Sequence, residues 1–275
     1  MFASIDLDAY FERIGYAGAR TPTLEVLREL HLRHAESIPF ENLNPLLKRP
    51  VNLDAEWLQQ KLIRERRGGY CYELNGLFAL ALDALGFRLT RLGARVVYLG
   101  DVNAFPPRTH MLLRVDLGDE SWIADVGFGV MVLTSPIRLT VDVPQETPHE
   151  PFRIVRWRDE YLMEAKVREA WGPLYRFTLR EQAPSDYELG NWFVSTHPSS
   201  LFVNFLVASR PAPGVRYALR NNELATHRLD GGTERRTLTT ADEVRAALVD
   251  LMQLELPGGE EMEALLERIA KTHAI

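Results

Sequence analysis

The residue best suited to covalent chemistry in this sequence is Cys71, the only cysteine among its 275 residues. It closely follows Gly68 and Gly69 and precedes a stretch with strong helical patterning. The start of a helix offers free N–H groups and a positive dipole end, and both favour a thiolate. A lone cysteine is more often a small buried apolar residue. The position after a glycine pair at a helix start favours the nucleophile instead.

A nucleophilic cysteine needs a base, and the base needs a group that orients it. His110 opens an apolar run that ends at a turn around Gly118, and Asp125 lies in the run that returns. In a hairpin with an even number of loop residues, Asp125 lies opposite Leu112 and on the same sheet face as His110. An aspartate in an apolar strand also needs a partner. Cys71, His110 and Asp125 therefore predict a catalytic triad.

The other histidines give weaker predictions. His31 and His34 lie three residues apart in a predicted helix, but a metal site needs further ligands that the sequence does not place. We therefore expect no bound metal.

The elements that must hold these residues fall into helices first and strands afterwards. Helical patterns begin at Asp6, after Thr23, near Asp54 and close to Cys71, and Gly86 is a plausible helix stop. Strand patterns follow at residues 91–99, 110–117, 121–126, 152–157, 161–167, 175–179, 202–208, 217–219 and 223–229, before a closing helix at 259–272. This order predicts an α+β fold. The three expected parts are 1–86, 87–190 and 191–275.

Composition limits the class of protein. The net charge of −6 argues against a nucleic-acid surface, which needs clustered positive charge. A single cysteine excludes an intramolecular disulfide and favours a reducing compartment. The N-terminus lacks a signal-peptide pattern, and no stretch reaches the roughly 18 apolar residues of a membrane span. We expect a soluble cytoplasmic protein without membrane or nucleic-acid partners, either a monomer or a homodimer.

Four short sequence motifs occur in the order and with the spacing that is typical of one protein family. They are RGGYCYELN at residues 67–75, IPFENL at 38–43, THM at 109–111 and DVGFG at 125–129. With these motifs the sequence resembles the arylamine N-acetyltransferase family, of bacterial type, from about residue 30 to residue 130. The resemblance weakens afterwards, although HPSSLF at 197–202 is also similar.

The resemblance implies a helical bundle with the cysteine, a central antiparallel β-barrel with His110 and Asp125, and a C-terminal α/β lid around a papain-like cysteine catalytic core. It implies ping-pong transfer from acetyl-CoA, a cosubstrate and not a tightly bound cofactor, to arylamines or hydrazines, as in xenobiotic metabolism. The acceptor cleft is implied for Phe40, Val96, Tyr98, Phe128 and Phe202, and CoA contacts for Thr109, Gly127, Phe128 and Gly129. Glu41, Arg67, Glu73 and Asn75 are implied as scaffold around Cys71.

One departure from the family pattern is Val130, where many bacterial relatives have another glycine. A side chain at this position narrows the approach of CoA.

Other functions share the order Cys, His, Asp. The main alternative is a papain-like or transglutaminase-like hydrolase or cross-linker, and a second is a related enzyme that closes amide rings in natural products. A non-catalytic binding domain would predict a damaged triad, and all three residues are present.

Overall fold

In the computed structural model, which describes residues 5–272, the chain begins with two helices capped by side chains. Asp6 accepts from the Ala9 N–H at the start of α1 (Leu7–Ile14), and Thr23 accepts from the Val26 N–H at the start of α2 (Leu24–Ser37). These caps satisfy N–H groups that a helix start leaves free. Helix α2 ends before Pro39, as expected.

The next helices lead to the cysteine. α3 (Leu43–Leu46) and α4 (Ala55–Gln59) are short, and α4 continues as the π-helical turn η1 (Gln60–Arg64). The helix predicted near Asp54 is therefore present in two parts. Cys71 is the first residue of α5 (Cys71–Ala84), and Gly86 follows it with a φ of +85°.

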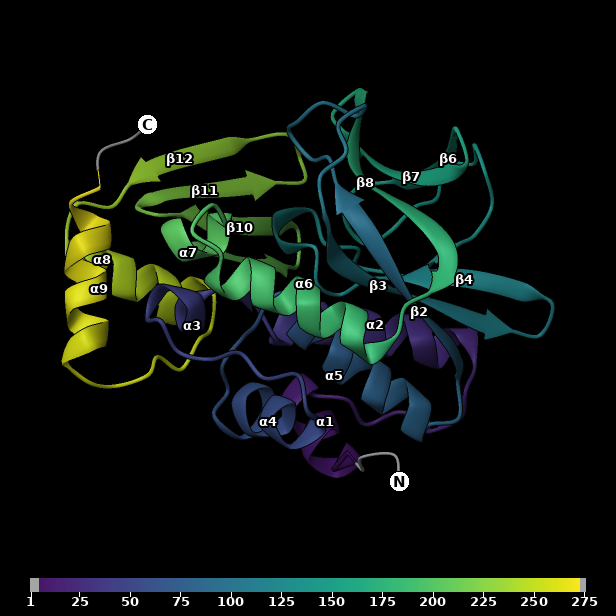
Figure 1. The fold of residues 1–275 in the computed structure, drawn as a ribbon, viewed down its shortest axis with the longest axis horizontal. Helices are drawn as coiled ribbons and strands as arrows, with labels where there is room; N and C mark the ends of the chain where they lie inside the picture. Colours follow the sequence, from purple (N-terminus) through teal and green to yellow (C-terminus); the bar gives the residue numbers. More distant parts are fainter. Residues whose placement is uncertain (1–4, 273–275) are drawn as a thin grey trace.

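The central part is a seven-stranded antiparallel sheet with the order β5-β4-β3-β2-β8-β7-β6. Its strands are β2 (Arg88–Val96), β3 (Arg108–Leu117), β4 (Glu120–Ala124), β5 (Ile137–Arg138), β6 (Phe152–Trp157), β7 (Glu160–Val167) and β8 (Ala170–Glu181). The segment after β5 bonds to the far edge, with the Asp142 N–H 2.8 Å from the Ile154 carbonyl. These contacts make the curved sheet a nearly closed barrel (Figure 1).

Strand β3 is buried on both faces because it lies between two cores. Met111, Leu113 and Val115 belong to the core shared with the helices, whereas Leu112 belongs to the barrel interior. Successive side chains of a strand point to opposite faces. His110, two residues from Leu112, therefore belongs to the barrel face.

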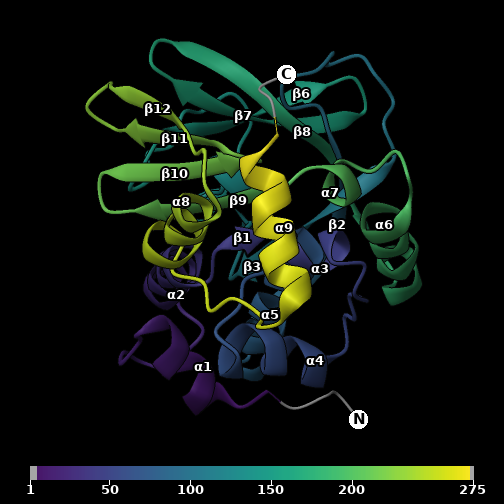
Figure 2. The same cartoon turned by 90° about the vertical axis from the view of Figure 1, so that its left-hand side faces the viewer.

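The C-terminal part is a five-stranded antiparallel sheet that includes one N-terminal strand. Its order is β1-β9-β10-β11-β12, with bounds β1 (Phe40–Glu41), β9 (Val207–Ala212), β10 (Val215–Arg220), β11 (Glu223–Arg228) and β12 (Thr233–Thr237). α8 (Ala241–Ala246), the π-helical η3 (Ala247–Leu251) and α9 (Glu260–Ala270) lie beside this sheet (Figure 2).

In chain order, two helices follow β8 and precede β9. α6 (Pro184–Thr196) crosses in front of α5 in Figure 1, and α7 (Leu201–Asn204) follows it. The strand predicted at 202–208 is wrong in its first half, because Ser200 caps a helical turn and β9 begins only at Val207. The expected division after residue 190 falls inside α6, and the three-part division stays a proposal.

The prediction of an α+β fold with helices first and an antiparallel barrel in the centre is confirmed. Within residues 5–272, none of the helices has the length and apolar content needed to cross a bilayer.

Candidate active site

The loop before Cys71 requires glycine for steric reasons. A Cβ atom on Gly68 would lie 2.2 Å from the Pro39 carbonyl oxygen. Gly69 pairs with the same segment, donating to Pro39 O at 3.2 Å and accepting from the Glu41 N–H at 3.0 Å. The close backbone approach fixes the start of α5 and therefore the position of Cys71.

The three residues predicted as a triad lie together and are buried. His110 Nε2 is 2.7 Å from Asp125 Oδ2, and the His110 side chain also hydrogen-bonds Cys71. Because Nε2 is bound to the carboxylate, Nδ1 is the ring nitrogen that remains for the thiol. The Thr109 carbonyl oxygen lies 3.4 Å from Cys71 Sγ and is a second acceptor within reach of the single thiol proton. This geometry is the one that a nucleophile, a base and a group orienting the base require.

The hairpin register matches the prediction. Leu113 pairs with Ala124, and Leu117 with Glu120, so the register continues to Leu112 and Asp125. Asp125 lies just beyond the end of β4, and it meets His110 diagonally across the hairpin.

Asn75 connects the helix to this hairpin. Residues four apart lie on the same helix face, so Asn75 follows Cys71 along α5 toward the barrel. Its amide Nδ2 donates to Asp125 Oδ1 at 2.9 Å and to the Met111 carbonyl at 2.8 Å, and its Oδ1 accepts from the Val126 N–H at 3.0 Å. All polar atoms of this side chain therefore help to place the carboxylate beside His110.

The buried histidine and aspartate stabilise each other's charged forms. Burial lowers the pKa of His110, but the charge and hydrogen bond of Asp125 outweigh it, so the pKa lies above its ordinary value. Burial raises the pKa of Asp125, and His110, the Asn75 amide and the Gly127 N–H reverse this, so the pKa is lowered. The imidazolium form beside Cys71 is the form that pairs with a thiolate.

Aromatic rings enclose His110 on the barrel side. The Phe128 ring lies edge-on to the imidazole at a centroid distance of 5.0 Å, and the Tyr175 ring lies at 4.9 Å. Burial, reinforced by Asp125, raises the pKa of Tyr175, so its phenol remains neutral. The sequence did not predict Tyr175 as a site residue; it is the pairing of β8 with β2, with Tyr175 opposite Val96, that brings it beside the hairpin.

The residues predicted for the acceptor cleft form two groups. Tyr98 contacts Phe128 at 6.0 Å between ring centroids, and Val96 lies opposite Tyr175 in the barrel. On the other side, Phe40 contacts Phe202 at 5.7 Å. Gly129 connects the two groups. It directly follows Phe128 in the chain, and a Cβ atom on it would lie 3.8 Å from the Phe40 ring.

Phe202 is placed by a side chain from the N-terminal part. Asn42 Nδ2 donates to the carbonyls of Phe202 and Phe205 at 2.8 and 2.7 Å. Its Oδ1 accepts from the Val207 N–H at 2.8 Å. The turn that contains Phe202 is thereby held against β1, which carries Phe40.

The turn predicted to contact CoA packs against the backbone of Cys71. A Cβ atom on Gly127 would lie 2.8 Å from Cys71 Cα, and Gly129 has a φ of +76°. Val130, in the 3₁₀ turn η2 (Gly129–Met131), packs its side chain against the barrel core, and its carbonyl accepts from Arg216 Nη1 at 3.1 Å.

A hollow opens beside Thr109. It has a volume of about 400 Å³ and is lined by Arg108, Thr109, Gly190, Trp192 and Phe193, among others. The predicted aromatic residues of the acceptor cleft are not among its lining residues, so their contact with an acceptor stays a prediction. No group of three or more His, Cys, Asp or Glu side chains suited to a metal ion occurs in the described part of the chain.

His31 is a further contact of Asp125 that the sequence did not reveal. The Asp125 N–H donates to His31 Nε2 at 3.1 Å, and the imidazole ring lies edge-on to Phe78. His34, on the same helix, hydrogen-bonds the Tyr10 hydroxyl at 2.9 Å. Neither histidine contacts solvent.

The two buried histidines predict a loss of stability in mild acid. Burial lowers the pKa of His31 to about 3, with Asp125 opposing it, and lowers that of His34 well below the ordinary value. Each ring gains a proton below pH 6.5 only on unfolding. At pH 5 we expect each to reduce the free energy of unfolding by about 2 kcal/mol relative to neutral pH. Urea unfolding at the two pH values measures this.

His34→Asn provides the comparison, because it removes one titrating ring. The loss on acidification should fall by about 2 kcal/mol in this variant. His149 and His227, whose pKa values burial also lowers, are common to both proteins and cancel. An equal loss in variant and parent would contradict the prediction.

Comparison with known proteins agrees with this geometry. A family model described as N-acetyltransferase matches residues 23–261. The arylamine N-acetyltransferase of Mycolicibacterium smegmatis is 42% identical over 275 residues, covering 98% of this chain and 100% of that protein. The corresponding protein of Escherichia coli K12 is 43% identical, covering 84% of this chain and 83% of its own length.

Solved structures give the same result. The structure of Mycobacterium marinum arylamine N-acetyltransferase superimposes with a TM-score of 0.93 at 42% identity, covering 96% of this chain and 100% of that one. The same protein in complex with CoA gives 0.92, with 96% and 99% covered. Fold and site thus define an N-acetyltransferase. More particularly, this chain belongs to the arylamine N-acetyltransferase family, as the four motifs predicted.

Proposed function

We propose that this protein transfers the acetyl group of acetyl-CoA to an arylamine or arylhydrazine through an acetyl-Cys71 intermediate. The observation that carries the proposal is the buried His110–Asp125 pair at 2.7 Å, with the His110 ring hydrogen-bonded to Cys71. The Mycobacterium marinum relative in complex with CoA supports CoA as the carrier of the acyl group. The relatives' names support the arylamine acceptor.

In the first half-reaction the Cys71 thiolate attacks the thioester carbonyl of acetyl-CoA. A bond forms between Cys71 Sγ and the carbonyl carbon, and the bond from that carbon to the CoA sulfur breaks. His110 gives its proton to the departing CoA thiolate. The backbone N–H of Cys71, at the start of α5, is a candidate donor to the oxyanion.

In the second half-reaction the amine attacks the acetyl-Cys71 carbonyl. Neutral His110 takes the proton that the amine nitrogen loses, and the Cys71 thiolate leaves. Arylamines and hydrazines are weak bases and are largely unprotonated at neutral pH, whereas alkylamines are mostly protonated. An apolar cleft also excludes the water that would hydrolyse the intermediate.

The binding assignments form part of the proposal. Thr109, Gly127, Phe128 and Gly129 contact CoA. Phe40, Val96, Tyr98, Phe128 and Phe202 line the acceptor cleft. Chemistry on a single reduced thiol suits the reducing cytoplasm, where we place the protein.

The test is the acetylation of Cys71 itself. Incubation with acetyl-CoA should add the mass of one acetyl group, and peptide mapping should place it on Cys71. Cys71→Ser should gain no such mass on the same timescale. Absence of the adduct in the wild-type protein, or equal labelling of the variant, would contradict the proposal.

The fate of the adduct separates the transferase from a hydrolase. An arylamine or a hydrazine should clear the acetyl group faster than buffer alone and should itself become acetylated. If neither acceptor accelerates clearance over water, the acceptor assignment is wrong, whereas the acyl-enzyme stands.

A further inference from the structure

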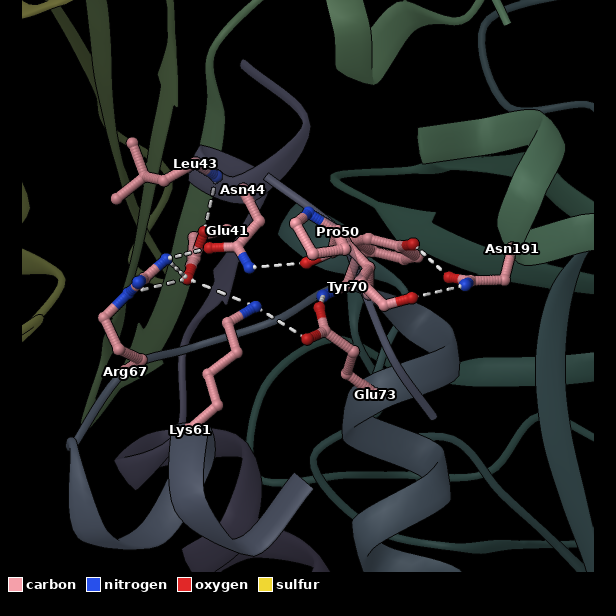
Figure 3. Close-up of polar contacts among 10 residues, drawn as sticks. Glu41, Leu43, Asn44, Pro50, Lys61, Arg67, Tyr70, Glu73 and Asn191 are labelled. Atoms are coloured by element: carbon pink, nitrogen blue, oxygen red, sulfur yellow. Dashed lines mark hydrogen bonds and ion pairs between the residues drawn. The ribbon is translucent and has the colours of Figure 1, made fainter. Parts of the chain in front are cut away.

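A buried lysine lies close to the nucleophilic turn, and no sequence motif points to it. Lys61, in η1, is 3% exposed. Its Nζ lies 2.6 Å from Glu73 Oε1 and 3.7 Å from Glu41 Oε1 (Figure 3). An unpaired ammonium at such a depth is costly, so these two carboxylates must compensate it.

Lys61 completes a cluster of four buried charges, Glu41, Lys61, Arg67 and Glu73, which we name the charge cluster. Arg67 Nη2 is 2.7 Å from Glu41 Oε1, and Glu41 Oε2 accepts from the Leu43 N–H at 2.5 Å. Two cations thus face two anions, and the cluster is neutral as a whole. Loss of any one charge leaves the cluster with a net charge.

Glu73 connects the charge cluster to the nucleophile. Its Oε2 accepts from the Tyr70 N–H at 3.1 Å, while its Oε1 binds Lys61. Tyr70 directly precedes Cys71, and Glu73 lies in the same first turn of α5. The Tyr70 hydroxyl in turn donates to Asn191 of α6 (Figure 3). A change in the charge of Glu73 therefore acts on the backbone that holds Cys71.

We propose that Lys61 is a positioning residue for acyl transfer: by balancing the negative charges of Glu73 and Glu41 it keeps the charge cluster neutral, and it thereby sets the pH range over which Cys71 reacts. The inference rests on the proposed function, in which Cys71 is the nucleophile.

The charged groups around Glu73 come from two other segments, η1 and β1. Burial raises the pKa of Glu73, Lys61 of η1 opposes this rise, and Glu41 of β1 adds to it. Burial also acts to raise the pKa of Glu41, but Arg67 and Lys61 outweigh it and the pKa is lowered. The titratable groups facing Cys71 are His110 and the phenols of Tyr70, Tyr72 and Tyr187. The pKa of Glu73 is raised on balance, and Lys61 is the cation that limits this rise.

The experiment measures the rate at which iodoacetamide alkylates Cys71 as a function of pH. Cys71 is the only cysteine, so the whole signal reports this thiol. Lys61→Gln removes one positive charge. While Glu73 stays ionised, the charge cluster is then net negative, and the midpoint of the rate profile should move about one pH unit toward alkali; an unmoved midpoint overturns the proposal. Glu73→Gln leaves a net positive charge and should move the midpoint in the opposite direction.

The double variant Lys61→Gln/Glu73→Gln removes one charge of each sign. Its midpoint should return to that of the wild type, and its acetylation rate should exceed that of Lys61→Gln. Lys61→Arg, which keeps the charge, should retain the wild-type midpoint. Arg64→Gln is the matched control, since Arg64 lies in the same turn but its partner Glu56 is exposed. This variant should not move the midpoint.

A purely structural role for Lys61 gives a different pattern. Both single variants would then lose rate at every pH without a shift, and the double variant would be worse than either; this outcome overturns the proposal. If Lys61→Gln does not fold, the other two variants still test the proposal. It then requires that the midpoint of Glu73→Gln moves toward acid and that the midpoint of the double variant returns to the wild-type value. Alkylation needs no acetyl-CoA, so a failure of acetyl transfer in the wild type is a separate result.

Discussion

Asp125→Asn is expected to slow acetylation of Cys71 by roughly 10³- to 10⁴-fold while the protein remains folded. Asp125 Oδ1 accepts from Asn75 Nδ2 at 2.9 Å and from the Gly127 N–H at 3.0 Å. An asparagine NH₂ cannot face two donors, so it must face His110. His110 Nε2 then has to accept, which places the ring proton on Nδ1, toward Cys71, where it blocks general-base action.

The measurement is the single-turnover rate of acetyl-Cys71 formation from acetyl-CoA, followed by mass spectrometry. Asp116→Asn, on the same hairpin but bonded to Ser121 and Arg114, is the control and should retain the wild-type rate. Thermal unfolding shows whether both variants are folded. A rate for Asp125→Asn within tenfold of wild type would show that the carboxylate does not set the tautomer of His110.

Gly127→Ala is expected to reduce kcat/KM at least about 100-fold, because the added methyl group displaces the nucleophile. Its Cβ would lie 2.8 Å from Cys71 Cα, 3.2 Å from the Cys71 carbonyl oxygen and 2.7 Å from Asn75 Nδ2. The first two atoms are backbone and have no alternative rotamer. Overpacking of this kind also costs about 1–3 kcal/mol of stability.

Gly258→Ala is the matched control, since a Cβ atom there would meet nothing within 4 Å. It should leave kcat/KM and the denaturant midpoint close to wild type. The comparison uses steady-state transfer from acetyl-CoA to an arylamine, with urea unfolding of both variants. Normal activity in Gly127→Ala would mean that the turn after β4 adjusts without moving Cys71.

Local patterns in the sequence were sufficient to predict the elements that carry Cys71, His110 and Asp125. The start of α5 at Cys71 follows from the glycines before it and the apolar stripe after it. The register of β3 and β4 follows from the turn at Gly118, because alternation in a strand admits only two faces. The 202–208 segment was read wrongly because Phe202 and Val203 resemble strand residues, whereas Ser200 caps a helical turn there.

Local sequence patterns did not predict the contacts that surround Cys71, His110 and Asp125. Lys61 reads as an ordinary surface lysine in a helix, and only the fold places it against Glu73 of the next helix and Glu41 of β1. Tyr175 reaches His110 from a strand 65 residues further along the chain. Such pairs depend on how separate elements pack, and no spacing rule within one element predicts them.

The sequence by itself was enough to predict the chemistry that we propose: it placed a cysteine at a helix start, a histidine and an aspartate on one face of a hairpin, and the helices and strands in the order that holds them. These are local properties, because helix and strand periods place side chains within a few residues. The tertiary structure alone decided the environment of that chemistry. Burial of His110 with Asp125, and of Lys61 with Glu73, arises where distant segments exclude water, and there the charge of one group fixes the charge of the other.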